Sequence, residues 1–195
     1  MSLAHTPTTE IVASRSTGRS LAEDFAIAAI GSAFMALCAH ISFPLLFSPV
    51  PLTLQTFGLL LIAFTMGPQR AFGAMTLYLI EGAAGLPVFS PAGPGGIAQL
   101  IGPTGGFLMI YPIAAYAAAS LFSIRKNVAF AYLGAITATT LFLASGFIWF
   151  KFVMHVSFTQ AFALAVAPFL PGEIIKIVAA SFAGERAQKL LARFQ

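Results

Sequence analysis

Residues 25–69 read FAIAAIGSAFMALCAHISFPLLFSPVPLTLQTFGLLLIAFTMGPQ and include no Asp, Glu, Lys or Arg. A helix needs about 20 consecutive apolar residues to cross the hydrocarbon core of a bilayer. This stretch is therefore long enough for more than one crossing. Residues 82–124 form a second stretch that lacks the same four residue types. The pattern predicts an integral membrane protein.

The composition argues against several other classes of protein. Of the 195 residues, 58% are hydrophobic and 8% are charged, whereas soluble domains contain about 45–50% apolar and about 25% charged residues. A soluble enzyme, a disordered protein and a secreted disulfide scaffold are therefore not expected, and a lone cysteine, Cys38, rules out an intrachain disulfide. The net charge is +4, but the Lys and Arg residues lie scattered between apolar segments, so we expect no nucleic-acid partner.

The alternation of apolar runs with Pro, Gly and charged residues predicts an all-α polytopic membrane protein with six transmembrane helices. The prolines at 44, 49 and 51 indicate a short turn after the first helix, and Pro168 with Pro171-Gly172 predicts a kink in the sixth. The six expected crossings are residues 21–43, 52–66, 68–84, 104–123, 128–150 and 159–183.

The distribution of positive charge predicts the orientation of the six-helix domain, residues 21–183. Cytoplasmic loops carry an excess of Lys and Arg, and with six crossings both termini share one side. The opposite side carries only Lys151. We therefore expect residues 1–20 and the basic residues 184–195 to be cytoplasmic tails. Ser20 is expected to cap the first helix, with Glu23 three residues on completing a capping box. The side expected to be cytoplasmic carries Arg15, Arg19, Arg70, Arg125, Lys126, Arg186, Lys189 and Arg193.

Residues 85–106, GLPVFSPAGPGGIAQLIGPTGG, do not resemble a helix, since seven are Gly and four are Pro. The segment lies on the expected outer side, between the third and fourth helices, and it is uncharged. Irregular backbone near a membrane must be buried in protein or line a cavity. The segment is interpreted as a lid or part of a binding site, with a plain connecting loop as the alternative.

The segment PFLPGEIIK, residues 168–176, places Glu173 and Lys176 deep in the sixth apolar run. Ionisable groups at such depth are costly and are candidates for function. Their spacing of three residues puts both on one helical face. They could bind a polar solute, or they could form an ion pair that only fixes helix packing.

Four other residues are candidates with a structural alternative. Glu81 could line a pocket or reach the outer interface, and Gln55 could bind a ligand or a neighbouring helix. Ala29 and Ala33 are spaced four apart, which allows close approach by a partner or by another helix of the same chain.

No motif for catalysis, ATP hydrolysis or metal binding is present. The sequence lacks GxSxG, the phosphate-binding motif GxxxxGK[ST], HExxH and any Cys/His cluster. His40 and His155 have no second ligand at metal spacing. ATP-driven transport would therefore need a partner.

Five segments occur in an order that resembles the BioY family, the biotin-binding S component of energy-coupling factor (ECF) transporters. They are SPVPLTLQTFGLLL (48–61), MGPQRAFGAMTLYL (66–79), GLPVFS (85–90), GPTGGF (102–107) and PFLPGEIIK (168–176). The resemblance covers residues 21–183. It implies a six-helix protein of the bacterial cytoplasmic membrane that captures biotin from outside at high affinity. It also implies a coupling protein and ATPase subunits as partners, with no cofactor and no enzymatic activity.

The resemblance also assigns roles to particular residues. Glu173 and Lys176 match the acid and the lysine of a family motif whose acid is more often Asp. Phe89, Gly105 and Gly106 fall in the covering loop and the helix that follows it, and Tyr111 would line the pocket. The resemblance implies that Ala29 and Ala33 form the docking face for the coupling protein. Glu81 falls where an apolar residue is expected and receives no role.

The chemistry of biotin fits these residues. Its ureido ring has two N–H donors and a carbonyl acceptor, so Glu173 can accept from the donors while Lys176 or Gln55 serves the carbonyl. Lys176 could instead bind the valerate carboxylate. An S component for another vitamin-like solute and an intramembrane enzyme using Glu81 or His155 are the alternatives. The sequence does not distinguish a monomer from a homo-oligomer.

Overall fold

The computed structural model describes residues 21–191 and residue 193. Residues 1–20 lie outside the described residues, so the expectations for them, including the cap at Ser20, are not tested. The described chain is mostly helical, with helices α1 (Leu21–His40), α2 (Gln55–Met66), α3 (Pro68–Ala83), α4 (Gly96–Ile101), α5 (Gly105–Met109), α6 (Tyr111–Arg125), α7 (Val128–Val153), α8 (Phe158–Ala165) and α9 (Leu170–Leu191), and strands β1 (Ser42–Leu45) and β2 (Ser48–Thr53).

Local sequence explains where several helices begin. Pro68 lies in the first turn of α3, where its missing N–H leaves no helical bond unmade. The side chain of Asn127 caps α7 by accepting a hydrogen bond from the backbone N–H of Phe130, at 3.0 Å. Ser157 and Gln160 form a capping box at the start of α8.

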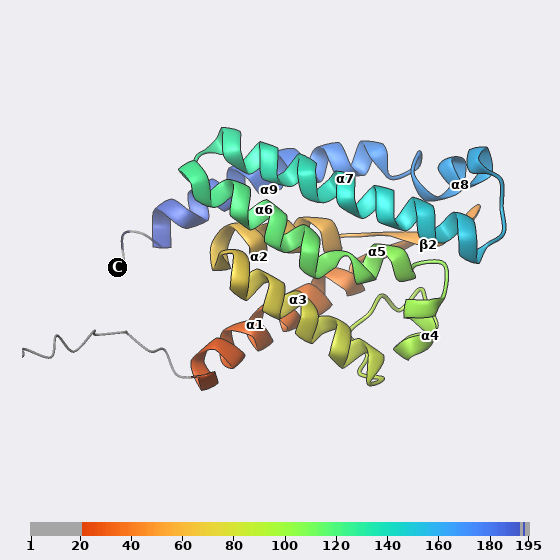
Figure 1. Cartoon of the computed structure of the whole chain (residues 1–195), viewed down its shortest axis with the longest axis horizontal. Coiled ribbons are helices and arrows are strands. Elements are labelled where there is room, and N and C mark those ends of the chain that lie inside the picture. Colours follow the sequence, from red (N-terminus) through yellow and green to blue (C-terminus); the bar gives the residue numbers. More distant parts are fainter. Residues whose placement is uncertain (1–20, 192, 194–195) are drawn as a thin grey trace, which may run out of the picture.

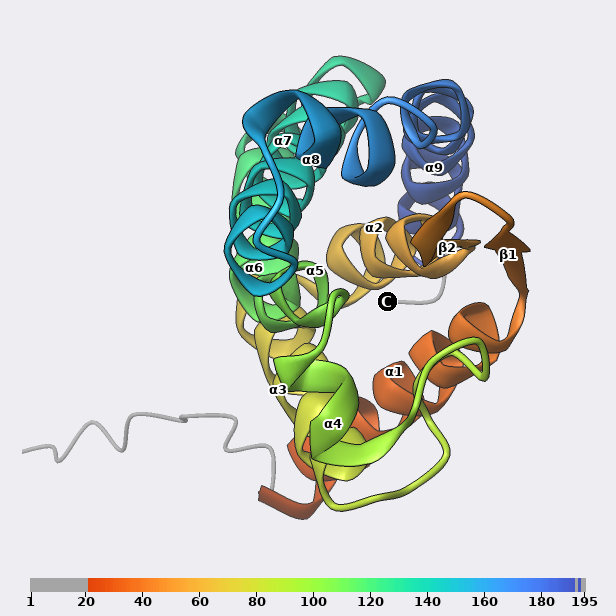
Figure 2. The same ribbon diagram turned by 90° about the vertical axis from the view of Figure 1, so that its right-hand side faces the viewer.

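Helix α2 lies in the middle of the bundle, as Figure 2 shows. Around it, α1 packs on α3, α3 on α6, α6 on α7 and α7 on α9, while α2 itself contacts α1, α6 and α9. Of the 12 residues of α2, eight are buried. Side chains of α2 therefore face protein on nearly all sides, and they can line a cavity in the interior.

The two ends of the bundle differ. Helix α1 begins and helix α9 ends at the same end of the bundle in Figure 1. The hairpin of β1 and β2, together with α4 and α8, gathers at the opposite end, which faces the viewer in Figure 2. We refer to this opposite end as the hairpin end.

The described residues include helices suited to a bilayer. By length and composition, α1 and α7 are each long and apolar enough to span one, and α8 with α9, bent by 48° at a short break, could form a third span. Large apolar side chains such as Phe25, Ile136 and Ile175 are exposed on the outside of the bundle, where lipid would cover them. The chain is a membrane protein, and the number of six crossings stays a prediction.

The expectation of an all-α fold is wrong at the turn that follows the first helix. Helix α1 ends at His40, and residues 42–53 form an antiparallel hairpin in which Ser42 pairs with Thr53 and Leu45 with Ser48. The prolines of this segment indicate only a turn, because proline cannot donate in a sheet ladder. Both strands of a two-stranded hairpin are edge strands, however, and an edge strand tolerates proline.

The interpretation of residues 85–106 as entirely non-helical is also wrong in part. Residues 96–101 form the short helix α4, and α5 begins at Gly105. The kink predicted near Pro168 is confirmed, since α8 and α9 meet at 48°. Helix α9 continues beyond residue 183 to Leu191, so no break in secondary structure separates residues 184–191 from the bundle.

Candidate binding site

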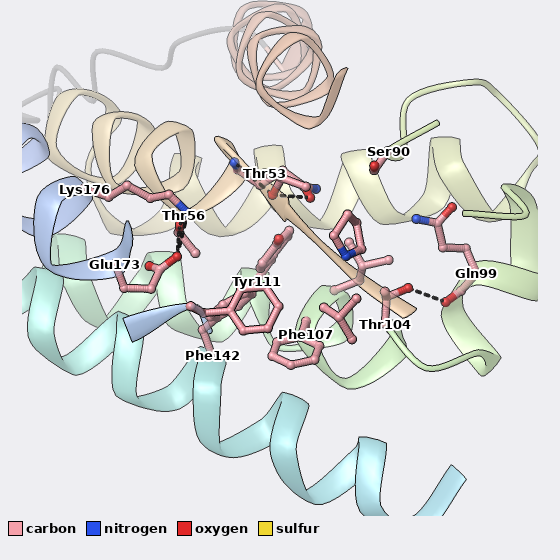
Figure 3. A pocket seen from close by; sticks show the side chains of 15 residues that line it. Thr53, Thr56, Ser90, Gln99, Thr104, Phe107, Tyr111, Phe142, Glu173 and Lys176 are labelled. Atoms are coloured by element: carbon pink, nitrogen blue, oxygen red, sulfur yellow. Dashed lines mark hydrogen bonds and ion pairs between the residues drawn. The ribbon is translucent and has the colours of Figure 1, made fainter. Parts of the chain in front are cut away.

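A cavity opens where α2, α6 and α9 begin, at the hairpin end of the bundle (Figure 3). Strand β2, the connection between α3 and α4, and helices α4, α5 and α7 complete its wall. The lining residues are Val50, Pro51, Thr53, Gln55, Thr56, Ser90, Gln99, Thr104, Phe107, Leu108, Tyr111, Phe142, Phe169, Glu173 and Lys176. Of the predicted site residues, the cavity lining includes Glu173, Lys176, Gln55 and Tyr111.

One end of the cavity is charged. The Nζ atom of Lys176 lies 2.6 Å from Oε1 of Glu173, so the predicted pair on one helical face is present. Thr56 of α2 joins them: its hydroxyl donates to Glu173 Oε1 at 2.9 Å and accepts from Lys176 Nζ at 3.0 Å. Glu173 also lies in the first turn of α9, where the helix dipole favours a negative charge.

The second carboxylate oxygen of Glu173 has no partner. Glu173 is 2% exposed, and its Oε2 atom is buried without a hydrogen bond among the described residues. A buried acceptor of this kind costs about 1–3 kcal/mol unless it is satisfied. Since the residue lines the cavity, a ligand with an N–H or O–H group could satisfy it.

The middle of the cavity is aromatic. The rings of Tyr111 and Phe142 are nearly parallel, with centroids 5.9 Å apart and an interplanar angle of 20°. Phe107 packs on Phe142 with centroids 4.9 Å apart, and Phe169 lies 6.2 Å from Phe107. These side chains offer flat apolar surface for the ring or chain of a small molecule.

The other end of the cavity is polar but uncharged. Ser90, Gln99 and Thr104 line it, on the right-hand side of Figure 3, away from Glu173 and Lys176. The hydroxyls of Ser90 and Ser42 are 2.8 Å apart, which joins the α3–α4 connection to β1. The Thr104 hydroxyl donates to the backbone carbonyl of Gln99 at 3.3 Å.

Gln55 lines the cavity with both ends of its amide already engaged. Its Nε2 donates to the Tyr78 hydroxyl at 2.8 Å, and its Oε1 accepts from the Thr53 hydroxyl at 3.0 Å. Tyr78 is fully buried in the core. The contact with Tyr78 corresponds to the alternative in which Gln55 bonds a neighbouring helix, so a ligand would have to share these bonds.

The free space is narrow. The centre of a water-sized sphere fits within only about 30 Å³ of the cavity. A ligand the size of biotin therefore requires lining side chains or the covering segments to move apart.

Three predicted residues lie outside the cavity lining and instead hold its walls. The Phe89 ring packs edge-on against Tyr78, with centroids 5.3 Å apart, and fills the space left by Gly82. A methyl group on Gly105 would overlap the Leu100 carbonyl, and one on Gly106 would overlap Trp149. The glycines therefore allow α5 to approach α4 and α7 closely.

Glu81 also lies away from the cavity lining. It accepts a hydrogen bond from the hydroxyl of Ser32, a fully buried residue of α1. The bond joins α3 to α1. The structure thus places Glu81 neither in the pocket nor free at the interface, but in a contact between two helices.

Ala29 and Ala33 lie on the outward side of α1. Ala33 is exposed and Ala29 is half-buried, and large apolar side chains such as Ile30 and Leu37 are exposed beside them. This face can meet either lipid or a partner helix.

No group of three or more His, Cys, Asp and Glu residues within residues 21–191 could hold a metal ion. His40 bonds the Ala36 carbonyl at 2.8 Å, and His155 is exposed. Cys38 is buried against Gly58, as expected for a small apolar residue.

Sequence reasoning missed several lining residues. Thr56 follows Gln55 directly, but threonine is common in apolar helices and carries no signal by itself. Gln99 is the polar side chain of the short helix GIAQLI, and its burial would be a signal once that segment is recognised as helical. Phe107 belongs to the GPTGGF motif, in which the glycines alone stand out by their pattern.

Comparison with known proteins gives the family. A model of the BioY family matches residues 8–193. The chain is 35% identical over 167 residues to a protein of Pyrococcus horikoshii named "Probable biotin transporter BioY", an alignment that covers 86% of this chain and 97% of the relative. It is 32% identical over 163 residues to "Biotin transporter BioY" of Thermotoga maritima, covering 84% and 94%.

The fold also matches a solved structure. That structure is described as the S-component for biotin from an ECF-type ABC transporter, and the superposition has a TM-score of 0.77 at 21% identity. It covers 86% of this chain and 92% of the other. On the strength of the family model and the two relatives, this chain belongs to the BioY family.

Proposed function

We propose that this protein is the biotin-binding membrane subunit of a biotin uptake system and that the cavity at the hairpin end holds the vitamin. The observation that carries the proposal is the buried Oε2 of Glu173, which lines the cavity and lacks a hydrogen-bond donor among the described residues. Membership in the BioY family and relatives named biotin transporters support the choice of biotin.

The chemistry of the cavity suggests how biotin binds. The ureido ring of biotin supplies the N–H donors that Glu173 lacks. The carbonyl of that ring can accept from Lys176, which already lies 2.6 Å from Glu173. The thiophane ring and valeryl chain then lie against Tyr111, Phe107 and Phe142.

The protein would not power transport by itself. The sequence has no phosphate-binding loop for ATP, so uptake against a gradient needs a partner that hydrolyses ATP. We expect an ECF coupling protein and ATPase subunits in this role, with Ala29 and Ala33 on the face of α1 that the coupling protein contacts. We further propose six crossings of a bacterial cytoplasmic membrane, with both termini inside.

The test is ligand identification on the full chain purified in detergent. The protein is denatured, the released small molecules are analysed by mass spectrometry, and biotin is then titrated into ligand-free folded protein. Near-stoichiometric biotin, or saturable binding on titration, is the expected result. Protein that binds thiamine or riboflavin but not biotin would contradict the proposal and support an S component for another solute.

The same samples test the enzyme alternative. Recovery of biotin with unchanged mass after prolonged incubation with the protein is expected for a binding subunit. A product of altered mass that depends on Glu81 or His155 would contradict the assignment as a non-enzyme.

A further inference from the structure

At the uncharged end of the cavity, Gln99 is the residue whose polar groups are least accounted for. It is 2% exposed and lies in the middle of α4. Its Oε1 accepts a hydrogen bond from the backbone N–H of Gly95 at 3.1 Å. No hydrogen bond of the described residues uses its Nε2, which carries two N–H donors.

The surroundings of Gln99 fix the direction of these donors. Gly93 packs directly on the side-chain amide: a methyl group at Gly93 would come within 2.7 Å of the Gln99 Cδ atom. With one amide face covered by Gly93 and Oε1 bound to Gly95, the amide has little freedom to rotate. Figure 3 shows Nε2 directed from α4 toward the interior of the site, on the side of Ser90.

The hydroxyls at this end have partners already. The Thr104 hydroxyl donates to the Gln99 carbonyl, and the Ser90 hydroxyl bonds with that of Ser42 and accepts from the backbone N–H of Ala92 at 3.4 Å. The Gln99 amide nitrogen is therefore the principal free donor on this side of the cavity among the described residues. This nitrogen is not one of the fully enclosed unpartnered atoms, and its residue lines the cavity, so an acceptor on a ligand can reach it.

We propose that Gln99 binds the carboxylate end of the ligand. The inference rests on the proposed function, since it takes biotin as the occupant and its ureido ring as the partner of Glu173. Biotin is polar at its two ends and apolar between them, as the cavity is. Once the ureido ring lies at Glu173, the valerate carboxylate points toward Gln99, whose Nε2 donates to it.

This assignment makes Gln99 a specificity residue. A carboxylate accepts a charge-assisted hydrogen bond from the amide, whereas the carboxamide of biotinamide has a weaker, neutral acceptor. The wild-type protein should therefore prefer biotin over biotinamide, and Gln99 should set much of that preference.

The substitution Gln99→Glu tests the assignment with little change of shape. Glutamate keeps an oxygen that accepts from Gly95, so the segment around α4 stays anchored, while the donor is replaced by a second oxygen. We expect biotin affinity to fall by at least about tenfold through repulsion between carboxylates, and affinity for biotinamide, which can donate to the new oxygen, to stay within about twofold. Both affinities are measured by titration calorimetry in detergent.

Two further variants separate the loss of the donor from the added charge. Gln69→Glu makes the same change at an exposed site near the opposite end of the bundle and should leave both affinities unchanged. Gln99→Leu removes the donor without adding charge. The ratio of the affinity for biotin to that for biotinamide should then fall toward one. If Gln99→Glu fails to fold, the preference measured with Gln99→Leu alone tests whether Gln99 binds the carboxylate.

The outcomes distinguish this inference from the proposed function. Wild-type protein that binds neither ligand would contradict the proposed function itself. Wild-type protein that binds biotin, with the same preference over biotinamide in both Gln99 variants, would overturn the inference alone. A preference that instead disappears in Lys176→Met would place the carboxylate at the charged end and overturn it as well.

Discussion

The two ends of the cavity are built by different means. At the charged end, Glu173, Lys176 and Thr56 are held by hydrogen bonds between α2 and α9, elements more than 100 residues apart in sequence. At the uncharged end, Gln99 and Thr104 sit on or beside short helices whose positions depend on close packing of Gly105 and Gly106. Hydrogen bonds between side chains therefore hold the charged end together, whereas close packing at glycines positions the uncharged end.

The difference suggests that the two ends of the cavity have different roles, ring recognition at the charged end and ligand entry at the uncharged end. The charged end lies on α2 and α9, which are longer than α4 and α5, so we expect it to keep its geometry and to suit the recognition of a rigid ring. The uncharged end lies on α4 and α5 and beside the α3–α4 connection, which can shift to admit a ligand into a cavity that is now narrow. Substitutions in the ion pair of the charged end should therefore lower affinity and stability together, whereas added bulk at the glycines that pack the uncharged end should lower stability first.

The largest effect is expected from Lys176→Met. The change removes the cation from Glu173, which is 2% exposed and keeps only Thr56 as a partner. Removing one member of a buried pair costs about 3–5 kcal/mol, so the midpoint of thermal unfolding in detergent should fall. Biotin affinity should fall by about 100-fold, or about 2.8 kcal/mol, because the ureido carbonyl loses its donor. Lys189→Met, which removes a lysine that is mostly exposed, is the matched control. An unchanged midpoint in Lys176→Met would contradict the account of the charged end.

Gly106→Ala should act on stability first. A methyl group at this position would overlap Trp149 of α7 and approach the Ser145 carbonyl to 2.7 Å. Overpacking of this kind costs about 1–3 kcal/mol. Gly73→Ala is the control, since nothing lies within 4 Å of the added methyl group, and it should be neutral or stabilise α3 by up to about 1 kcal/mol. Equal unfolding midpoints for the two variants would show that the close approach of α5 to α7 does not matter.

Thr56→Val should give a smaller, more local effect. It keeps the shape of the side chain but removes the hydroxyl that bonds both Glu173 and Lys176. We expect biotin affinity to fall about tenfold, as for the loss of a hydrogen bond to a charged group. Thr139→Val is a matched control, because the Thr139 hydroxyl is buried without a partner among the described residues. A loss in Thr139→Val as large as in Thr56→Val would mean that the hydroxyl bonds at the charged end are not the cause.

Glu81→Gln should have the smallest effect. The amide can still accept from Ser32, so the contact between α1 and α3 is kept, and the residue lies outside the cavity lining. We expect biotin affinity within about twofold of wild type, since no ligand bond is lost. A tenfold loss in a calorimetric titration would show that Glu81 reaches the ligand when the cavity opens.

Much of the helical architecture could be predicted because a bilayer demands long apolar runs. The helices around residues 21–40 and 128–153 follow from length and hydropathy alone, and the kink at Pro168 follows from the ring of proline. The hairpin at residues 42–53 could not be predicted, because its prolines fit a turn equally well. Its register depends on pairing between the two strands rather than on a local signal.

The cavity lining was predictable where the chemistry is local. Glu173 and Lys176 can be recognised from sequence because two charges three residues apart, deep in an apolar run, are costly and rare without a function. The roles of Thr56 and Gln99 depend on the packing of α2 against α9 and on burial of α4, which sequence spacing does not encode. Phe89, Gly105 and Gly106 are predicted near the ligand because of their motifs; in the structure they pack the walls of the cavity, and a contact with the ligand stays a prediction.

The most direct test of the central claim is a biotin titration on the double variant Glu173→Leu, Lys176→Met. Replacing a buried ion pair by apolar residues of similar size is often neutral for stability or even favourable. We therefore predict a folded protein with an unfolding midpoint at least equal to that of Lys176→Met alone, and no saturable biotin binding at concentrations about 100-fold above the wild-type Kd. Wild-type biotin affinity in this folded double variant would contradict the assignment of the cavity as the biotin site.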